Sequence, residues 1–188
     1  MQRCRAGDLA AFNALVEAHQ DAVYGLCLRM LGSTHSAEDV TQETFLSAYR
    51  NIERCRGDAF RAWLLRIALN ACTDELRRSR RRRQVSLDDP STGASPLDLP
   101  DPAELPEEAA LRSELGRHLQ SALMALPPDQ RAAVVLRDVQ GFSYDEIAQT
   151  LRLSPGTVKS RLSRGRARLR DLLLQQRELL PQQFRLTD

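Results

Sequence analysis

The chain reads FSYDEIAQTLRLSPGTVKSRLSR over residues 142–164, and this stretch has the pattern of a helix-turn-helix. Ser143 and Glu146 form a capping-box pair, which predicts the start of a short helix. Ser154 and Pro155 follow as an N-cap and a first-turn proline, which predict a second helix after a tight turn. The stretch therefore predicts two helices joined by a turn, the unit with which many proteins bind duplex DNA.

The apolar residues of this stretch fit the same motif. Ala148 is the small residue required where the helices touch, and Val158 is the apolar side chain that packs between them. Ile147, Leu151 and Leu162 complete the predicted core. Arg152 occupies the turn position where glycine is usual, so we expect it to adopt a left-handed conformation at a cost of about 1 kcal/mol.

The second helix carries cations on one side and no acid between Ser154 and Arg170. A solvated helix normally mixes charges of both signs, so this imbalance indicates contact with phosphate. Residues in the N-terminal part of a recognition helix read bases, and the remainder contact the backbone. The predicted base readers are Lys159, Ser160, Ser163 and Arg164, and the other predicted DNA contacts are Thr157, Arg161, Arg166 and Arg168.

Helical periodicity also covers most of the chain outside this stretch. We expect a long helix from Leu9 to Leu31, a second helix capped by Ser36 and ending near Ile52, and a third helix after an Asp58 cap. After residue 106 we expect a helix over 107–126 and another from Pro128 to about Asp138. The predicted fold class is all-α.

Charge divides the chain into two basic bodies and an acidic connection. The net charge is +4 over residues 1–83, −7 over residues 84–108, and +5 over residues 109–188, although the whole chain carries only +2. Five prolines lie in the acidic segment. We therefore predict an N-terminal helical bundle over 1–83, a flexible acidic linker over 84–108, and a C-terminal four-helix domain over 109–175. A tail then covers 176–188.

Composition excludes several other classes of protein. The four cysteines form no C-x-x-C pair, so we expect neither a metal site nor a disulfide framework, and we expect Cys27 and Cys72 to lie in the core. We find no signal peptide and no apolar run of ~18 residues, which predicts a cytoplasmic protein without membrane insertion. Arginine supplies 26 of the 27 basic residues, which suits nucleic acid binding but is also typical of a GC-rich genome.

Three ordered motifs resemble those of extracytoplasmic-function (ECF) sigma factors, the subunits that direct bacterial RNA polymerase to promoters. The helix-turn-helix resembles the family's −35 reader. Residues 37–45 resemble its polymerase-binding helix and residues 60–70 its −10 element, while Gly7-Asp8, Ala11-Phe12 and Leu15-Val16 resemble its opening. The likeness covers nearly all of residues 5–175.

The resemblance implies a non-enzymatic function with no catalytic residues, no cofactor, no metal and no small-molecule substrate. It implies core RNA polymerase and promoter DNA as partners, duplex at −35 and melted at −10, together with a restraining anti-sigma factor. Polymerase would contact Asp39, Gln42, Glu43 and Thr44. The −10 strand would contact Arg54, Arg56, Phe60, Arg61, Trp63, Asn70, Arg77 and Arg78.

Some of these assignments leave alternatives open. Phe60 and Trp63 lie on an apolar face and also fit a core position, and the run over 77–83 is either an upstream phosphate contact or a disordered tail. In the family the acidic linker runs toward the polymerase active-site cleft, where Asp88, Asp89, Asp98 and Asp101 would mimic nucleic acid charge.

Two other classes of protein compete with this interpretation. A stand-alone DNA-binding regulator also uses a helix-turn-helix, but it needs a dimerising or sensing domain in residues 1–105, and none is indicated. A nucleic-acid enzyme such as a recombinase needs a catalytic constellation. Ser79 lies among arginines without catalytic partners, and His19, His35 and His118 are scattered along the chain.

Overall fold

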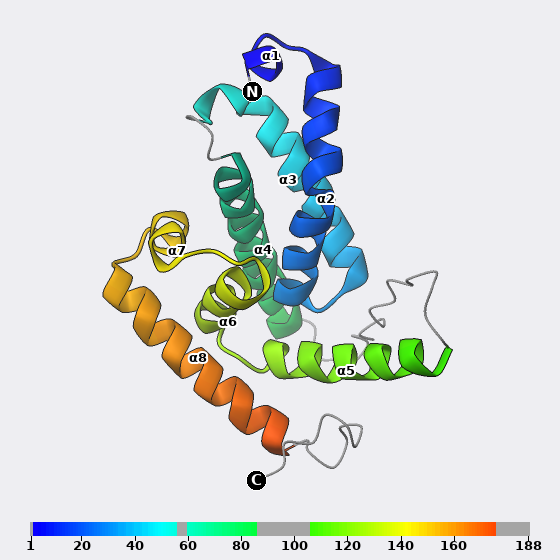
Figure 1. The fold of residues 1–188 in the computed structure, drawn as a ribbon, viewed down its shortest axis with the longest axis vertical. Helices are drawn as coiled ribbons and strands as arrows, with labels where there is room; N and C mark the ends of the chain where they lie inside the picture. Colours follow the sequence, from blue (N-terminus) through cyan, green and yellow to red (C-terminus); the bar gives the residue numbers. More distant parts are fainter. Residues whose placement is uncertain (1, 56–59, 86–105, 176–188) are drawn as a thin grey trace.

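The computed structural model describes residues 2–55, 60–85 and 106–175, and every regular element in these ranges is helical (Figure 1). The N-terminal helices are α1 (Gln2–Arg5), α2 (Leu9–Leu31), α3 (Thr34–Arg50) and α4 (Phe60–Val85), with a 3-10 turn at Ile52–Arg54. The C-terminal helices are α5 (Pro106–Met124), α6 (Pro128–Val134), α7 (Tyr144–Leu151) and α8 (Pro155–Gln175). The predicted all-α fold is confirmed, and none of these described helices is long and apolar enough to cross a bilayer.

Helix α2 has the boundaries that its sequence predicts. Asp8 caps its N-terminus by accepting a hydrogen bond from the Ala11 backbone N–H at 3.0 Å, and this bond lowers the pKa of the Asp8 carboxyl. Gly32 ends the helix with φ 73°, a left-handed conformation that favours glycine. The chain then reverses and α3 packs antiparallel beside α2 (Figure 1).

The start of α3 differs from the prediction. Ser33, not Ser36, is the N-cap, and its hydroxyl accepts a hydrogen bond from the Ser36 backbone N–H at 3.3 Å. Both serines are suitable caps, but the left-handed Gly32 has already reversed the chain, so the helix begins directly after it. Helix α3 also ends earlier than predicted. It stops at Arg50, and Ile52 begins the 3-10 turn.

Helix α4 is longer than predicted and continues two residues past 83. The arginine run at 77–83 is therefore helical, and the alternative of a disordered tail is wrong. The predicted Asp58 cap, Arg56, the linker aspartates at 88, 89, 98 and 101, and the tail over 176–188 lie outside the described residues.

The helix predicted from Pro128 to Asp138 changes its winding part way along. Helix α6 ends at Val134, and Val135–Val139 form a π-helical turn. The Gln140 backbone N–H donates to the Val135 carbonyl at 3.0 Å, which closes a wider ring than an α-helical bond. Periodicity alone does not reveal such a turn, because its one extra residue hardly changes the apolar pattern.

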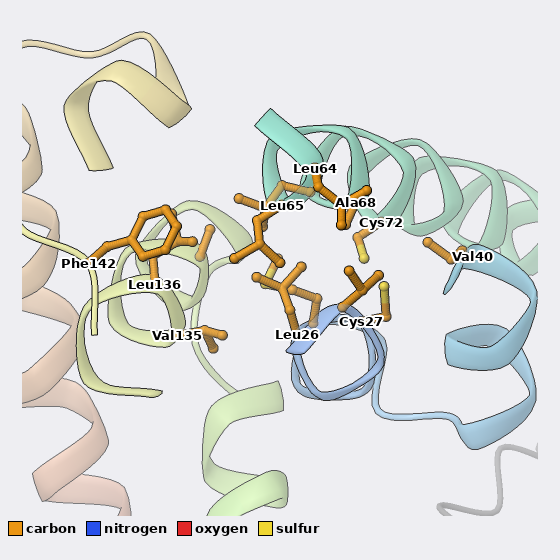
Figure 2. Close-up of a cluster of buried hydrophobic side chains, with 14 of the residues drawn as sticks. Leu26, Cys27, Val40, Leu64, Leu65, Ala68, Cys72, Val135, Leu136 and Phe142 are labelled. Carbon is orange, nitrogen blue, oxygen red and sulfur yellow. The ribbon is translucent and has the colours of Figure 1, made fainter. Parts of the chain in front are cut away.

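The buried side chains form one cluster that extends through both domains (Figure 2). Leu26 and Cys27 of α2 face Ala68 and Cys72 of α4, and the C-terminal domain contributes residues that include Val135, Leu136 and Phe142. As predicted, Cys27 and Cys72 are fully buried. Their thiols lie against each other, and this contact together with burial raises the pKa of the Cys72 thiol.

Helices α6 and α8 pack closely at Gly165. A Cβ atom at this position would lie 2.9 Å from Val134 Cγ2 and 3.4 Å from the Gln130 carbonyl oxygen. Real Cβ contacts are not that short, and Val134 is buried and β-branched, so it has little freedom to move. Gly165 therefore sets how closely α8 approaches α6.

We predict that Gly165→Ala destabilises the protein by about 1–3 kcal/mol, because overpacking outweighs the helix propensity that alanine adds. The matched control is Gly116→Ala in α5, where a Cβ would meet no other atom within 4 Å. Gly116→Ala should raise stability by about 0.5–1 kcal/mol. Thermal unfolding of both variants checks the pair, and equal shifts in the two would contradict the close contact.

Candidate polymerase and promoter interfaces

The helix-turn-helix has the local geometry that its sequence predicts. Ser143 accepts a hydrogen bond from the Glu146 N–H at 3.2 Å, and its own N–H donates to Glu146 Oε2 at 2.7 Å. The second bond lowers the pKa of the Glu146 carboxyl. Arg152 adopts φ 55° and ψ 50°, the expected left-handed turn conformation, and the Leu153 N–H donates to the Ala148 carbonyl at 2.9 Å. Val158 is fully buried between the helices.

Four predicted base readers share one exposed face of α8. Lys159, Ser160, Ser163 and Arg164 all lie on the surface. The Arg164 Nε donates to the Ser160 carbonyl at 3.2 Å, and the Ser160 hydroxyl donates to the Thr157 carbonyl at 2.9 Å. These bonds hold two of the readers along the helix, where both remain accessible.

Two other predicted DNA contacts pair with acids of α6 and of the π turn that follows it. Arg161 is half-buried, and its Nε lies 3.2 Å from Asp129 Oδ2. The Arg166 Nε donates to Asp138 Oδ2 at 3.0 Å, and the Asp138 carboxylate raises the pKa of Arg166. Arg161 thus bridges α8 to α6 and Arg166 bridges α8 to the π turn, and both remain predicted DNA contacts, with Arg166 the more exposed of the two.

The remaining −35 residues lie at the two ends of this surface. Thr157 is half-buried in the first turn of α8, where its hydroxyl shares a hydrogen bond of 2.8 Å with Ser154 Oγ. Arg168 is exposed further along the helix. A shallow hollow lined by Tyr144, Lys159, Ser163 and other residues lies on the same side of the domain.

A second exposed surface follows α3. Asp39, Gln42 and Glu43 are exposed and line a shallow groove together with Leu46 and residues up to Asn51. Leu46 is 50% exposed, and Tyr49 beside it is 41% exposed. Sequence analysis missed these two apolar side chains. The helical spacing of 39, 42, 43, 46 and 49 nevertheless places Leu46 and Tyr49 on the same face as the three polar residues.

Thr44 does not belong to this surface. Its side chain is fully buried, and its hydroxyl donates to the Val40 carbonyl at 2.7 Å within the core. The predicted contact between Thr44 and polymerase is therefore wrong in this structure. The cause is helical geometry, since Thr44 lies two residues from Gln42 and so points to the opposite side of α3.

The predicted −10 residues are spread along α4 and the turn before it. Arg54, Arg61, Asn70, Arg77 and Arg78 are exposed, although the Arg61 guanidinium donates to Gln140 of the C-terminal domain. Arg77 and Arg78 also lie 3.4 Å and 3.7 Å from carboxylate oxygens of Asp74 and Glu75.

The two aromatic residues of this group divide between core and surface. Phe60 is 5% exposed, and its ring lies 5.4 Å from the His19 ring and 5.9 Å from the Trp63 ring. Phe60 is therefore a core residue, and the expectation that it contacts the −10 strand is corrected. Trp63 is half-buried and keeps part of its ring on the surface.

Comparison with known proteins identifies the two domains. Sigma-70 region 2 matches residues 15–82, and Sigma-70 region 4 matches residues 117–169. The ECF RNA polymerase sigma factor SigW of Bacillus subtilis is 36% identical over 178 residues, which cover 92% of this chain and 94% of that protein. The ECF sigma factor SigE of Mycolicibacterium smegmatis is 44% identical over 170 residues, 89% of this chain but only 64% of SigE, so the chain spans less than two thirds of that relative.

A solved structure agrees with the sequence relatives. The sigma factor RpoE from Bartonella quintana, in complex with the anti-sigma factor NepR, aligns with a TM-score of 0.71 and 28% identity. The alignment covers 88% of this chain and 98% of that chain, so it includes both domains. The protein therefore belongs to the extracytoplasmic-function family of RNA polymerase sigma factors.

Proposed function

We propose that this protein binds core RNA polymerase in the cytoplasm and directs it to selected promoters, without catalysing a reaction itself. The observation that carries the proposal is the pairing of a basic helix-turn-helix face on α8 with a separate α3 surface in one chain. A stand-alone DNA-binding regulator needs the first surface but has no use for the second.

The proposed division of the chain is an N-terminal domain over residues 1–83, a linker over 84–108 and a C-terminal domain over 109–175.

Reading of the −35 element is assigned to the exposed face of α8. Lys159, Ser160, Ser163 and Arg164 lie where the N-terminal half of a recognition helix meets base edges in the major groove. Thr157, Arg166 and Arg168 are assigned to the phosphate backbone. Arg161, which pairs with Asp129 in this structure, is assigned to the same backbone contacts.

Capture of the melted −10 strand is assigned to α4 and the turn before it. Single strands bind where cations follow the backbone and an aromatic ring stacks on a base. Arg54, Arg61 and Asn70 supply exposed polar groups, and the accessible part of Trp63 supplies the ring. Arg77 and Arg78 extend the same helix toward upstream phosphates.

Docking on polymerase is assigned to the α3 groove. Asp39, Gln42 and Glu43 give polar contacts, while Leu46 and Tyr49 give the apolar area that supplies most of the free energy of a protein interface. We further propose an anti-sigma factor as a second partner, because the related RpoE aligns over both domains in its complex with NepR.

The direct test adds the purified chain to core RNA polymerase with a library of promoter fragments. We expect specific transcripts that start at a defined subset of fragments and are absent with core enzyme alone. Binding of the free chain to a palindromic operator, with no effect on polymerase specificity, would instead support a stand-alone regulator.

The α3 assignment predicts that Leu46→Asp weakens binding to core polymerase at least tenfold, because a charge replaces buried contact area at the interface. The matched control is Leu174→Asp near the C-terminal end of α8. Leu174 is 41% exposed, compared with 50% for Leu46. Titration of labelled chain against core enzyme measures both. Equal effects of the two changes would remove α3 from the interface.

The division of α8 into readers and backbone contacts makes a separate prediction. Arg164→Ala should cost about 1–3 kcal/mol on the cognate −35 sequence and little on other sequences. Arg168→Ala should weaken binding uniformly and lower the salt dependence of the affinity by about one unit of slope. Electrophoretic titrations at several salt concentrations distinguish the two, and identical, sequence-independent losses would contradict the division.

A further inference from the structure

A hollow of about 210 Å³ lies where α7 of the C-terminal domain meets α4 of the N-terminal domain (Figure 1). Polar residues line it from both sides. Arg66 and Asn70 belong to α4, while Thr150 and Arg152 belong to α7 and to the turn that follows it. None of the described residues that line the hollow is acidic. Its volume exceeds the space that one water molecule needs many times over, so the hollow can hold a ligand.

Thr150 is the buried polar group of this hollow. It is 5% exposed, and its hydroxyl has no hydrogen-bond partner within the described part of the chain. A threonine in a helix can satisfy its hydroxyl by donating to the carbonyl four residues earlier, as Thr73 does to Leu69 at 2.8 Å. Thr150 does not make that bond. A buried hydroxyl without a partner is costly, so it indicates a group that the hollow receives.

Arg152 holds a backbone conformation that favours glycine. Its φ is 55°, in the turn between α7 and α8. The turn requires only the backbone, and glycine would adopt the same conformation without strain. Strained residues of this kind concentrate at functional sites, where the side chain compensates for the strain. The Arg152 side chain lines the hollow, so arginine adds a cation there that glycine could not supply.

Arg66 brings a second cation from the opposite wall. It is half-buried and lies four residues before Asn70, so both side chains are on one face of α4. Other arginines pair with acids, as Arg161 does with Asp129. Among the described residues, neither Arg66 nor Arg152 has an acidic partner. Two cations around one hollow repel each other, and an anion between them removes that repulsion.

We infer that this hollow is a binding site for the phosphate group of a small molecule. Two guanidinium groups, the Asn70 amide and the Thr150 hydroxyl supply hydrogen-bond donors from opposite walls. A phosphate group presents three acceptor oxygens in a tetrahedral arrangement and can therefore accept from both walls. A carboxylate presents only two oxygens in one plane and reaches fewer of these donors. Arginine also suits phosphate because its planar fork forms two parallel hydrogen bonds.

A ligand in this hollow contacts both domains at once. Elsewhere the C-terminal domain is fixed to α2 by hydrogen bonds that Gln120, Gln140 and Arg131 donate to backbone carbonyls. A bound phosphate group adds a connection to α4 and stabilises the contact between α4 and α7 by mass action. The inference goes beyond the promoter-reading function, and it holds whether or not α4 binds the −10 strand.

The test follows thermal unfolding of the full chain in titrations with inorganic phosphate and, separately, with pyrophosphate. We expect the Tm of the wild type to rise and to saturate. Arg66→Gln should weaken the apparent affinity for pyrophosphate at least tenfold, because charge-assisted hydrogen bonds are lost. Arg117→Gln is the matched control, since Arg117 is exposed on α5 and does not line the hollow. General salt effects on stability act on both variants alike.

A second set of variants separates loss of the site from loss of folding. Thr150→Val removes the unpartnered hydroxyl, so without ligand its Tm should equal or exceed that of the wild type, whereas its affinity for pyrophosphate should fall at least threefold. Thr41→Val is the control, because the Thr41 hydroxyl is also buried but belongs to α3, outside the hollow. Arg152→Gly should raise the Tm without ligand by about 2–4 °C and still weaken pyrophosphate binding at least tenfold.

The outcomes decide the inference in either direction. A wild-type Tm that neither anion raises to saturation overturns the site. Equal responses of Arg66→Gln and Arg117→Gln also overturn it, because the response then comes from other cations such as those of α8. A labelled single-stranded oligonucleotide of mixed sequence tests the competing macromolecule. If Arg66→Gln and Arg152→Gly weaken its binding but leave the pyrophosphate response unchanged, the two arginines are strand contacts and the phosphate site is wrong.

Discussion

The packing of helix α4 is the constraint on which both domains depend. Its apolar residues cover so wide an arc that one helix serves two partners. Ala68 and Cys72 face α2, as the contact between Cys72 and Cys27 shows, while Leu65 faces the π turn and Phe142 of the other domain (Figure 2). Arg61 bonds to Gln140 at the start of α4, and Asn70, half a turn round the helix, lines a hollow with Thr150 of α7. The candidate strand-binding residues thus lie beside the line along which the domains meet.

This arrangement explains which parts of the fold the sequence could predict. The boundaries of α2, the capping box at Ser143 and the left-handed Arg152 follow from local chemistry, since each depends on residues within one turn. The burial of Thr44 and the shift of the cap to Ser33 also have local causes, but they require the register of α3 to be known to within one residue. A motif that covers several consecutive residues does not supply that register.

The candidate site was less predictable where charges pair across elements. The absence of acids between Ser154 and Arg170 suggested that the cations of this helix had no acidic partners, yet Asp129 and Asp138 approach from α6 and the π turn. Those acids lie about 30 residues away in the chain, so no local rule links them to α8. The exposed Leu46 and Tyr49 were missed for the opposite reason, because an apolar residue on an amphipathic helix is normally assigned to the core.

The junction between the domains combines apolar contact with polar bonds to backbone carbonyls. A wholly apolar junction would expose a large apolar surface if the domains separated, and such a surface favours aggregation. Carboxylate partners for Arg131 would hold a buried ion pair that is costly to break. Gln120, Gln140 and Arg131 instead donate to backbone carbonyls of α2, so these bonds fix the position of the C-terminal domain on α2 without a buried ion pair.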